Sequence, residues 1–67
     1  MNTNRAMYNQ RIIELLLQFT KQYPDIRFEQ MLEILEKDAP KDTFYEESQV
    51  TYERMAKNFR SRAGLDK

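Results

Sequence analysis

Only three residues in this chain of 67 break up an otherwise helix-compatible sequence: Pro24, Pro40 and Gly64. Proline inside a helix removes a backbone hydrogen bond, and glycine weakens helices. Between these breaks, apolar residues recur every three or four positions, which is the period of a helix with one buried face. The sequence therefore predicts an all-α fold, a three-helix miniature domain. Its helices are expected at roughly 5–22, 25–37 and 48–62, within a single domain 1–67.

The first break is the corner at Tyr23 and Pro24. The proline ring pushes the preceding residue toward an extended conformation, so the first helix is expected to end there. Asp25 is the expected cap of the second helix, because its carboxylate can accept the free N–H groups of the first turn. The predicted apolar faces are Tyr8, Ile12, Leu15, Leu16, Phe19 and Tyr23 in the first helix, and Phe28, Met31, Leu32 and Leu35 in the second.

The run DAPKDTFYEES after Lys37 has no helical period and is predicted to be a loop of about ten residues. Phe44 and Tyr45 are expected to anchor this loop on the helices, because burying a large apolar side chain gains roughly 1.5–3 kcal/mol. Ser48 is the expected cap of the third helix, and Gly64 is its expected end. The apolar face of this helix is predicted to be Tyr52, Met55, Ala56 and Phe59.

Two short segments carry a resemblance. YPDIRFEQ at 23–30 and FYEES at 44–48 resemble the landmarks of a loose group of short, uncharacterised bacterial and phage helical proteins. The likeness extends from about Ile12 to Phe59. It implies a small helical fold and brings no known activity with it.

The residue types of the chain bear on its chemistry. It has no cysteine and no histidine, so the commonest general base, the best nucleophile at neutral pH and the usual zinc ligands are missing. No catalysis, cofactor, metal or small-molecule substrate is therefore expected. The longest apolar run is the trio Leu15-Leu16-Leu17, and no basic-then-apolar leader opens the chain, so a soluble cytoplasmic protein without membrane association is expected.

Charge is unevenly distributed, although the formal net charge is zero. Residues 25–47 carry eight acids against three bases, whereas 48–67 are net positive by three. Four acids of the second helix share one flank, which is either a solvated face or a surface for a cation or basic partner: Asp25, Glu29, Glu33 and Glu36. Arg27 is expected either to pair with a nearby acid or to contact an anion at the helix N-terminus.

The first helix is apolar over an arc of about 200°, wider than the roughly 100° stripe that covers one core. Ile13, Leu17, Met7 and Tyr8 are therefore expected to stay partly uncovered and to form a protein interface. A second copy, packed antiparallel about a two-fold axis, would supply the core that so short a chain lacks. Alternatively, the same surface is expected to bind a larger protein. The competing structural prediction is that the third helix and the Phe44 loop cover this flank.

The alternative function is nucleic-acid binding by the last helix. Its candidate contacts are Gln49, Arg54, Lys57 and Arg60, polar and basic side chains of the kinds that meet base edges and phosphates. A helix-turn-helix joins its helices by a turn of about 3–4 residues, which is shorter than the loop expected here. Protein interaction is therefore the main prediction.

Overall fold

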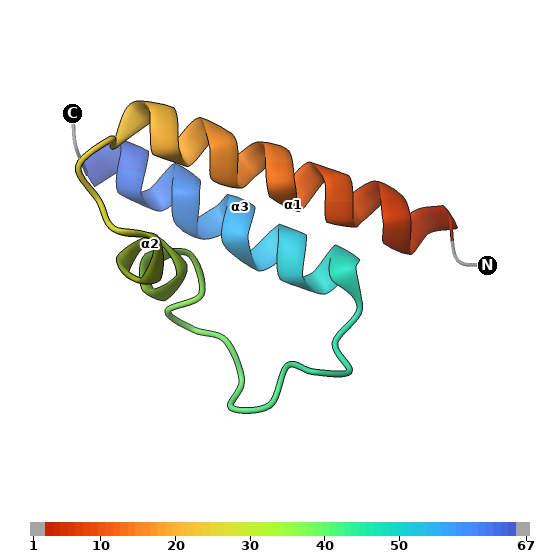
Figure 1. The fold of residues 1–67 in the computed structure, drawn as a ribbon. Helices are drawn as coiled ribbons and strands as arrows, with labels where there is room; N and C mark the ends of the chain where they lie inside the picture. Colours follow the sequence, from red (N-terminus) through yellow and green to blue (C-terminus); the bar gives the residue numbers. More distant parts are fainter. Residues whose placement is uncertain (1–2, 66–67) are drawn as a thin grey trace.

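The computed structural model describes residues 3–65 as three α-helices joined by a corner and a long loop (Figure 1). The helices are α1 (Thr3–Gln22), α2 (Phe28–Leu35) and α3 (Ser48–Leu65). No strand occurs among these residues, so the all-α, three-helix prediction is confirmed. Of the predicted domain 1–67, Met1, Asn2, Asp66 and Lys67 lie outside the described residues.

The two long helices, α1 and α3, lie side by side and run in the same direction (Figure 1). The short α2 crosses them near their C-terminal ends and is seen almost end-on in this view. Because α2 makes no progress along the length of the molecule, residues 36–47 must carry the chain back to the start of α3. An extended segment of this length reaches about 40 Å, and α1 is about 30 Å long. The helix directions therefore explain the long loop.

The core contains side chains from all three helices. Phe19 from α1, Met31 and Leu35 from α2, and Met55 from α3 are buried. Aromatic contacts extend this core, because the Phe19 ring lies 5.3 Å from Phe59, edge to face, and 4.8 Å from Tyr23. The other residues packed on the core are Ile12, Leu15, Leu16, Ile26, Leu32 and Ile34. The predicted apolar faces of α1 and α3 are thus confirmed in the main.

The start of α2 differs from the prediction. Pro24 occupies the second position of a turn closed by the Ile26 N–H and the Tyr23 carbonyl, at 3.2 Å, which is a favoured place for proline. The turn moves the helix start past Asp25, so Asp25 is not the cap. Arg27, in an extended conformation with φ −73° and ψ 154°, precedes the first helical residue. Its N–H donates to Gln30 Oε1 at 3.1 Å, which is one half of a capping box.

The later start also changes the predicted apolar face of α2. Phe28 becomes the first residue of the helix and is 60% exposed, whereas it was expected in the core. At the other end α2 stops at Leu35, two residues before the predicted boundary. There Asn58 of α3, which is buried, donates through Nδ2 to the Leu35 carbonyl at 2.6 Å. A side chain from another helix thus satisfies a carbonyl at the end of α2.

The third helix begins at residue 48 as predicted, but the roles of Ser48 and Gly64 at its ends differ from the prediction. Ser48 is the first helical residue, and its hydroxyl donates to Asn9 Oδ1 on α1, so it joins two helices and is not a cap. The backbone carbonyl before it, that of Glu47, accepts the Thr51 N–H at 3.3 Å. Gly64 does not end α3, because the helix continues to Leu65 and this glycine has no positive φ. None of the three described helices is long and apolar enough to cross a bilayer.

Candidate protein-interaction surface

A single arginine of α3 joins the two ends of the loop 36–47. Arg54 Nη2 lies 2.6 Å from Glu46 Oε1 at the end of the loop and 3.2 Å from Glu36 Oε1 at its start. Arg54 Nη1 donates to Glu46 Oε2 at 2.9 Å, and the Thr51 hydroxyl donates to Glu46 Oε1 at 2.6 Å. Only 9% of the Arg54 side chain is exposed, so these charge-assisted hydrogen bonds are shielded from water.

These contacts shift the ionisation of both partners. The hydrogen bonds from Arg54 and then Thr51 lower the pKa of Glu46 to about 2. The same pair raises the pKa of Arg54, since the carboxylate stabilises its charged form. Both groups are therefore ionised at neutral pH, and Arg54 holds the end of the loop through Glu46 and its start through Glu36.

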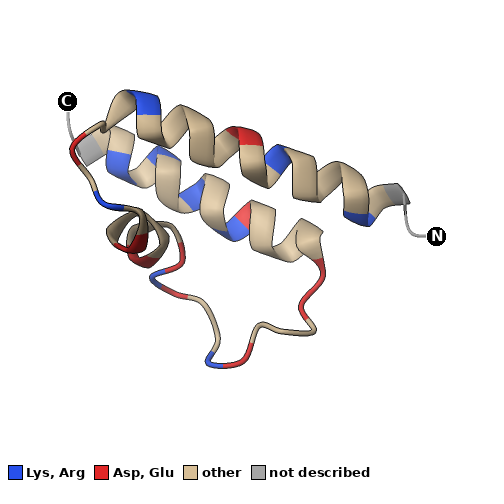
Figure 2. Cartoon of the chain, in the orientation of Figure 1, with Lys and Arg blue, Asp and Glu red and all other residues tan. Residues whose placement is uncertain are grey.

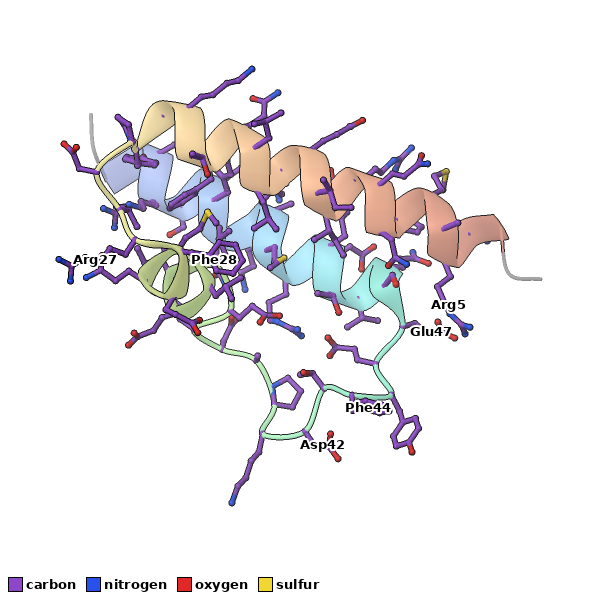
Figure 3. The ribbon with its side chains drawn as sticks, in the orientation of Figure 1. Arg5, Arg27, Phe28, Asp42, Phe44 and Glu47 are labelled. Atoms are coloured by element: carbon purple, nitrogen blue, oxygen red, sulfur yellow. The ribbon has the colours of Figure 1, made fainter. Side chains whose placement is uncertain are left out.

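Two further contacts hold the ends of the loop. Arg5 of α1 donates to Glu47 through Nε at 2.9 Å and Nη2 at 2.8 Å, and the two side chains point toward one another in Figure 3. Asn58 Nδ2 donates to Asp38 Oδ1 at 2.9 Å, and this bond lowers the pKa of Asp38. The loop is consequently attached near both ends by polar and ionic contacts.

An exposed aromatic pair lies near the C-terminal end of this loop, directly before Glu46. Phe44 is 83% exposed and Tyr45 is 88% exposed, and their rings meet edge to face with centroids 4.9 Å apart. The Phe44 N–H donates to Asp42 Oδ1 at 3.1 Å, and Figure 3 shows Phe44 on the loop, away from the helices. The prediction that Phe44 and Tyr45 anchor the loop is therefore wrong. Charged side chains attach the loop near its two ends, and the rings of Phe44 and Tyr45 contact each other.

The residues predicted to contact nucleic acid are not equally available. Arg54 is committed to Glu46 and Glu36, so its guanidinium is not free to contact a base or phosphate. Gln49 Nε2 donates to Glu53 at 3.3 Å. Lys57 and Arg60 are exposed on α3. Of the predicted nucleic-acid contacts, Lys57 and Arg60 are therefore available to phosphates, whereas Arg54 is not.

The acidic flank of the second helix does not form a cluster of ligands. In the part of the chain from 3 to 65, no three carboxylates come together in a way that could hold a metal ion. Glu36 pairs with Arg54, and Asp25 lies before α2, so the flank is shorter than expected. Arg27 is exposed, and its side chain extends from the start of α2 toward solvent (Figure 3). Within residues 3–65 it makes no ion pair.

A groove of about 590 Å³ lies between α2 and α3. Ile26 and Ile34 give it an apolar lining, while Glu33, Lys37 and Arg62 add charge. The Arg62 guanidinium also stacks over the Tyr23 ring, 4.9 Å from its centroid. A ligand in this groove could make apolar contacts and ion pairs, and, among residues 3–65, Glu33 is the one carboxylate in the lining.

The outer flank of α1 is uncovered, as the width of its apolar arc predicts. Ile13 is 65% exposed, Leu17 is 54% exposed, and Met7 is 38% exposed. Tyr8 is half-buried, because its ring lies 5.8 Å from that of Tyr52 on α3. The competing prediction, that the third helix and the Phe44 loop cover this flank, is wrong.

Ile13 and Leu17 belong to a longer stripe on α1, which we call the α1 seam. Its members are Ala6, Gln10, Ile13, Leu17 and Thr20. Their spacings of four, three, four and three average 3.5 residues, which is the repeat of a coiled-coil contact face. All five residues are exposed and none is charged. Figure 2 shows the charged residues of α1 as isolated coloured segments separated by tan stretches. This spacing is present in the sequence, but only the structure shows that the seam is uncovered from Ala6 to Leu17, whereas the Thr20 hydroxyl contacts Met31 Sδ of α2 at 3.7 Å.

Comparison with known proteins adds no relative. No protein family, no curated protein and no solved structure matches this chain. The likeness of the segments 23–30 and 44–48 to short bacterial and phage proteins stays a prediction.

Proposed function

We propose that this protein is a small, non-catalytic interaction module that acts by self-association through the α1 seam. The observation that carries the proposal is the seam itself, an exposed and uncharged stripe with a coiled-coil repeat and two large aliphatic side chains at its centre. Two neighbouring large aliphatic side chains that stay exposed on one face of a helix support a contact surface there. A helix of a larger protein with a similar stripe would fit the same face.

The size of the core supports pairing between copies. Only four apolar side chains among the described residues are buried, and a core of this size rarely supplies more than about 3–5 kcal/mol. A second copy would cover Ile13 and Leu17 on both chains, at roughly 1 kcal/mol for each half-exposed side chain. Association entropy opposes this gain and costs at least about 4 kcal/mol, so the four aliphatic side chains alone do not hold two copies together. The other seam residues must add to the contact, and we expect a weak dimer at most, with a dissociation constant on the order of 100 μM or higher.

Nucleic-acid binding through α3 remains the alternative, and two observations weigh against it. Arg54 is held by two carboxylates. Glu46 and Glu47 also lie directly before α3, where phosphates would have to approach the helix. Lys57 and Arg60 alone would give a small dependence on salt, because each phosphate contact adds about one unit to the slope.

The mass of the protein in solution tests the proposal. Light scattering over about 10 μM to 1 mM should show a mass that rises from 8.2 kDa toward twice that value. Leu17→Glu should stay at 8.2 kDa throughout and keep its helical circular dichroism, because Leu17 is not in the core. Gln18→Glu is the matched control, since this exposed residue lies about 100° away around the same helix. It should behave like the parent chain.

Two results would overturn the proposal. One is a parent chain that stays monomeric at about 1 mM. The other is a Leu17→Glu variant whose mass rises with concentration as the parent's does. Loss of helical signal in Leu17→Glu would show instead that Leu17 belongs to the core, and would overturn the assignment of the seam as a surface.

A further inference from the structure

Four of the five residues of the α1 seam are symmetric about position 15, whereas Ala6 has no counterpart within α1, because position 24 lies beyond the helix. Ile13 and Leu17 lie two residues on either side of position 15, and Gln10 and Thr20 lie five residues on either side. If a second α1 runs in the opposite direction, this symmetry places Ile13 opposite Leu17 twice and Gln10 opposite Thr20 twice. A shift by one heptad would instead place Ile13 opposite Gln10. Polar layers of this kind select a register, because a mismatch buries a polar side chain against an apolar one.

The order of the two aliphatic residues disfavours a parallel pair. In the heptad repeat of the seam, Leu17 takes an a position and Ile13 takes a d position. Parallel two-stranded coils prefer the reverse, with a β-branched residue at a and leucine at d, whereas leucine at a with isoleucine at d shifts parallel helices to larger assemblies. In an antiparallel pair each of the two aliphatic layers combines one isoleucine with one leucine, so this conflict does not arise.

The distribution of charge does not select a direction. The acids of α2 lie at the end of the molecule where α1 finishes, but Arg60 and Arg62 lie there too, because α3 runs the same way as α1. Acids and bases therefore occur together at that end, which Figure 2 shows in red and blue. Glu14 and Lys21 lie on the same side of the seam. In the antiparallel pair each Glu14 has one like and one opposite charge of the other copy nearby, so these effects offset.

We propose that the partner of the α1 seam is a second copy of this chain packed antiparallel, with Ile13 of each copy against Leu17 of the other. This inference rests on the proposed function and gives its geometry. The two-fold axis passes the helices at the level of residue 15. The Arg5–Glu47 contact places the end of each loop near the N-terminal end of its own α1. The dimer therefore carries its two Phe44–Tyr45 pairs toward opposite ends.

Disulfide cross-linking tests this arrangement directly, because the chain contains no cysteine. The variants are Ile13→Cys and Leu17→Cys, one of them carrying a tag that changes its mass. A disulfide requires Cα atoms within about 7 Å. Under mild oxidation the mixture of the two variants should form a mixed cross-linked dimer, while each variant alone should cross-link at least about tenfold more slowly. Leu17→Cys mixed with Gln18→Cys, off the seam, is the control and should not cross-link.

The outcomes separate the two proposals. Rapid cross-linking of Ile13→Cys with itself, in a parent chain that dimerises, would show a parallel pair and overturn only this inference. A parent chain that dimerises while no mixture cross-links would overturn the register, and the Leu17→Glu mass measurement would then decide the role of the seam. A monomeric parent chain without cross-links would overturn the proposed function, and this inference with it.

Discussion

At the scale of single residues, Arg54 makes three hydrogen bonds to side chains outside α3. Its guanidinium contacts Glu36 and Glu46, which are at opposite ends of the long loop. A charge that is shielded from water is tolerated when it is paired and hydrogen-bonded, and its removal leaves partners without compensation. One side chain of α3 thereby sets where the loop leaves α2 and where it rejoins α3.

The Glu46 carboxylate makes the stability of the fold depend on pH. Because its pKa falls to about 2 in the folded protein, from an ordinary value of 4.5, the unfolded chain binds this proton more readily. The contribution of Glu46 is therefore fully present above about pH 4.5 and is lost as the pH falls toward 2. Urea unfolding at a series of pH values should show this loss.

Glu46→Gln is the control for this dependence. The variant lacks the titrating group, so the fall in its free energy of unfolding between about pH 4.5 and 2 should be smaller than in the parent chain. A remaining fall is expected, because Arg5 lowers the pKa of Glu47 and Asn58 lowers that of Asp38. Identical pH profiles for the two proteins would show that Glu46 contributes nothing through its charge.

At the scale of elements, the loop 36–47 follows from the directions of the helices. Since α1 and α3 run the same way and α2 crosses them, the loop has to return along the molecule (Figure 1). An extended connection of this kind presents few residues to the core. Its aromatic pair consequently stays outside, although two adjacent aromatic residues in a polar segment look like an anchor.

Phe44 and Phe19 form a matched pair for testing this description. Phe44→Ala should change the free energy of unfolding by less than about 0.5 kcal/mol, because the side chain is 83% exposed. Phe19→Ala should cost about 3–5 kcal/mol, because the same substitution empties a fully buried site. Chemical denaturation measures both. A cost near 3 kcal/mol for Phe44→Ala would show that the loop packs on the helices in solution.

At the scale of the whole molecule, the small core limits the stability of the monomer, and the uncovered α1 seam is where further apolar area could be buried. The described chain is elongated, with extents of 40 × 23 × 20 Å, so much of α1 lies at the surface. Short chains bury a smaller share of their surface than long ones, and this limits their stability. Pairing through the α1 seam would add buried apolar area outside the monomer core.

This coupling predicts a melting temperature that rises with protein concentration. Binding of a second copy to the folded state stabilises it by mass action. With a dissociation constant on the order of 100 μM, a rise from about 10 μM to 1 mM should add roughly 1 kcal/mol, or about 4–8 °C. Circular dichroism melts of the parent chain and Leu17→Glu measure this shift. The variant should melt at the same temperature throughout, and a parent chain that does the same would contradict the coupling.

The sequence by itself determined that three helices form, the core faces of α1 and α3 and the width of the apolar arc on α1, but it placed Phe28 of α2 in the core, where it does not lie. Phe19, Leu35 and Met55 could be assigned to the core, because a helical period depends on residues three or four positions apart. The exposure of Ile13 and Leu17 followed from the same reasoning, since an arc of about 200° exceeds what one core covers. Pro24 likewise marked the end of α1.

Only the tertiary structure decided which residues meet across the loop. Asn58 of α3 contacts the end of α2, and Arg54 of α3 contacts Glu36 and Glu46. The partners in these contacts lie 8 to 23 positions apart in the sequence. Such contacts depend on the relative directions of α1, α2 and α3. The spacing of apolar residues within one helix does not predict those directions. The same directions leave Phe44 and Tyr45 exposed. The hydrophobicity of a side chain indicates that its burial would stabilise the fold. Whether it lies close enough to the core to be buried depends on the path of the chain.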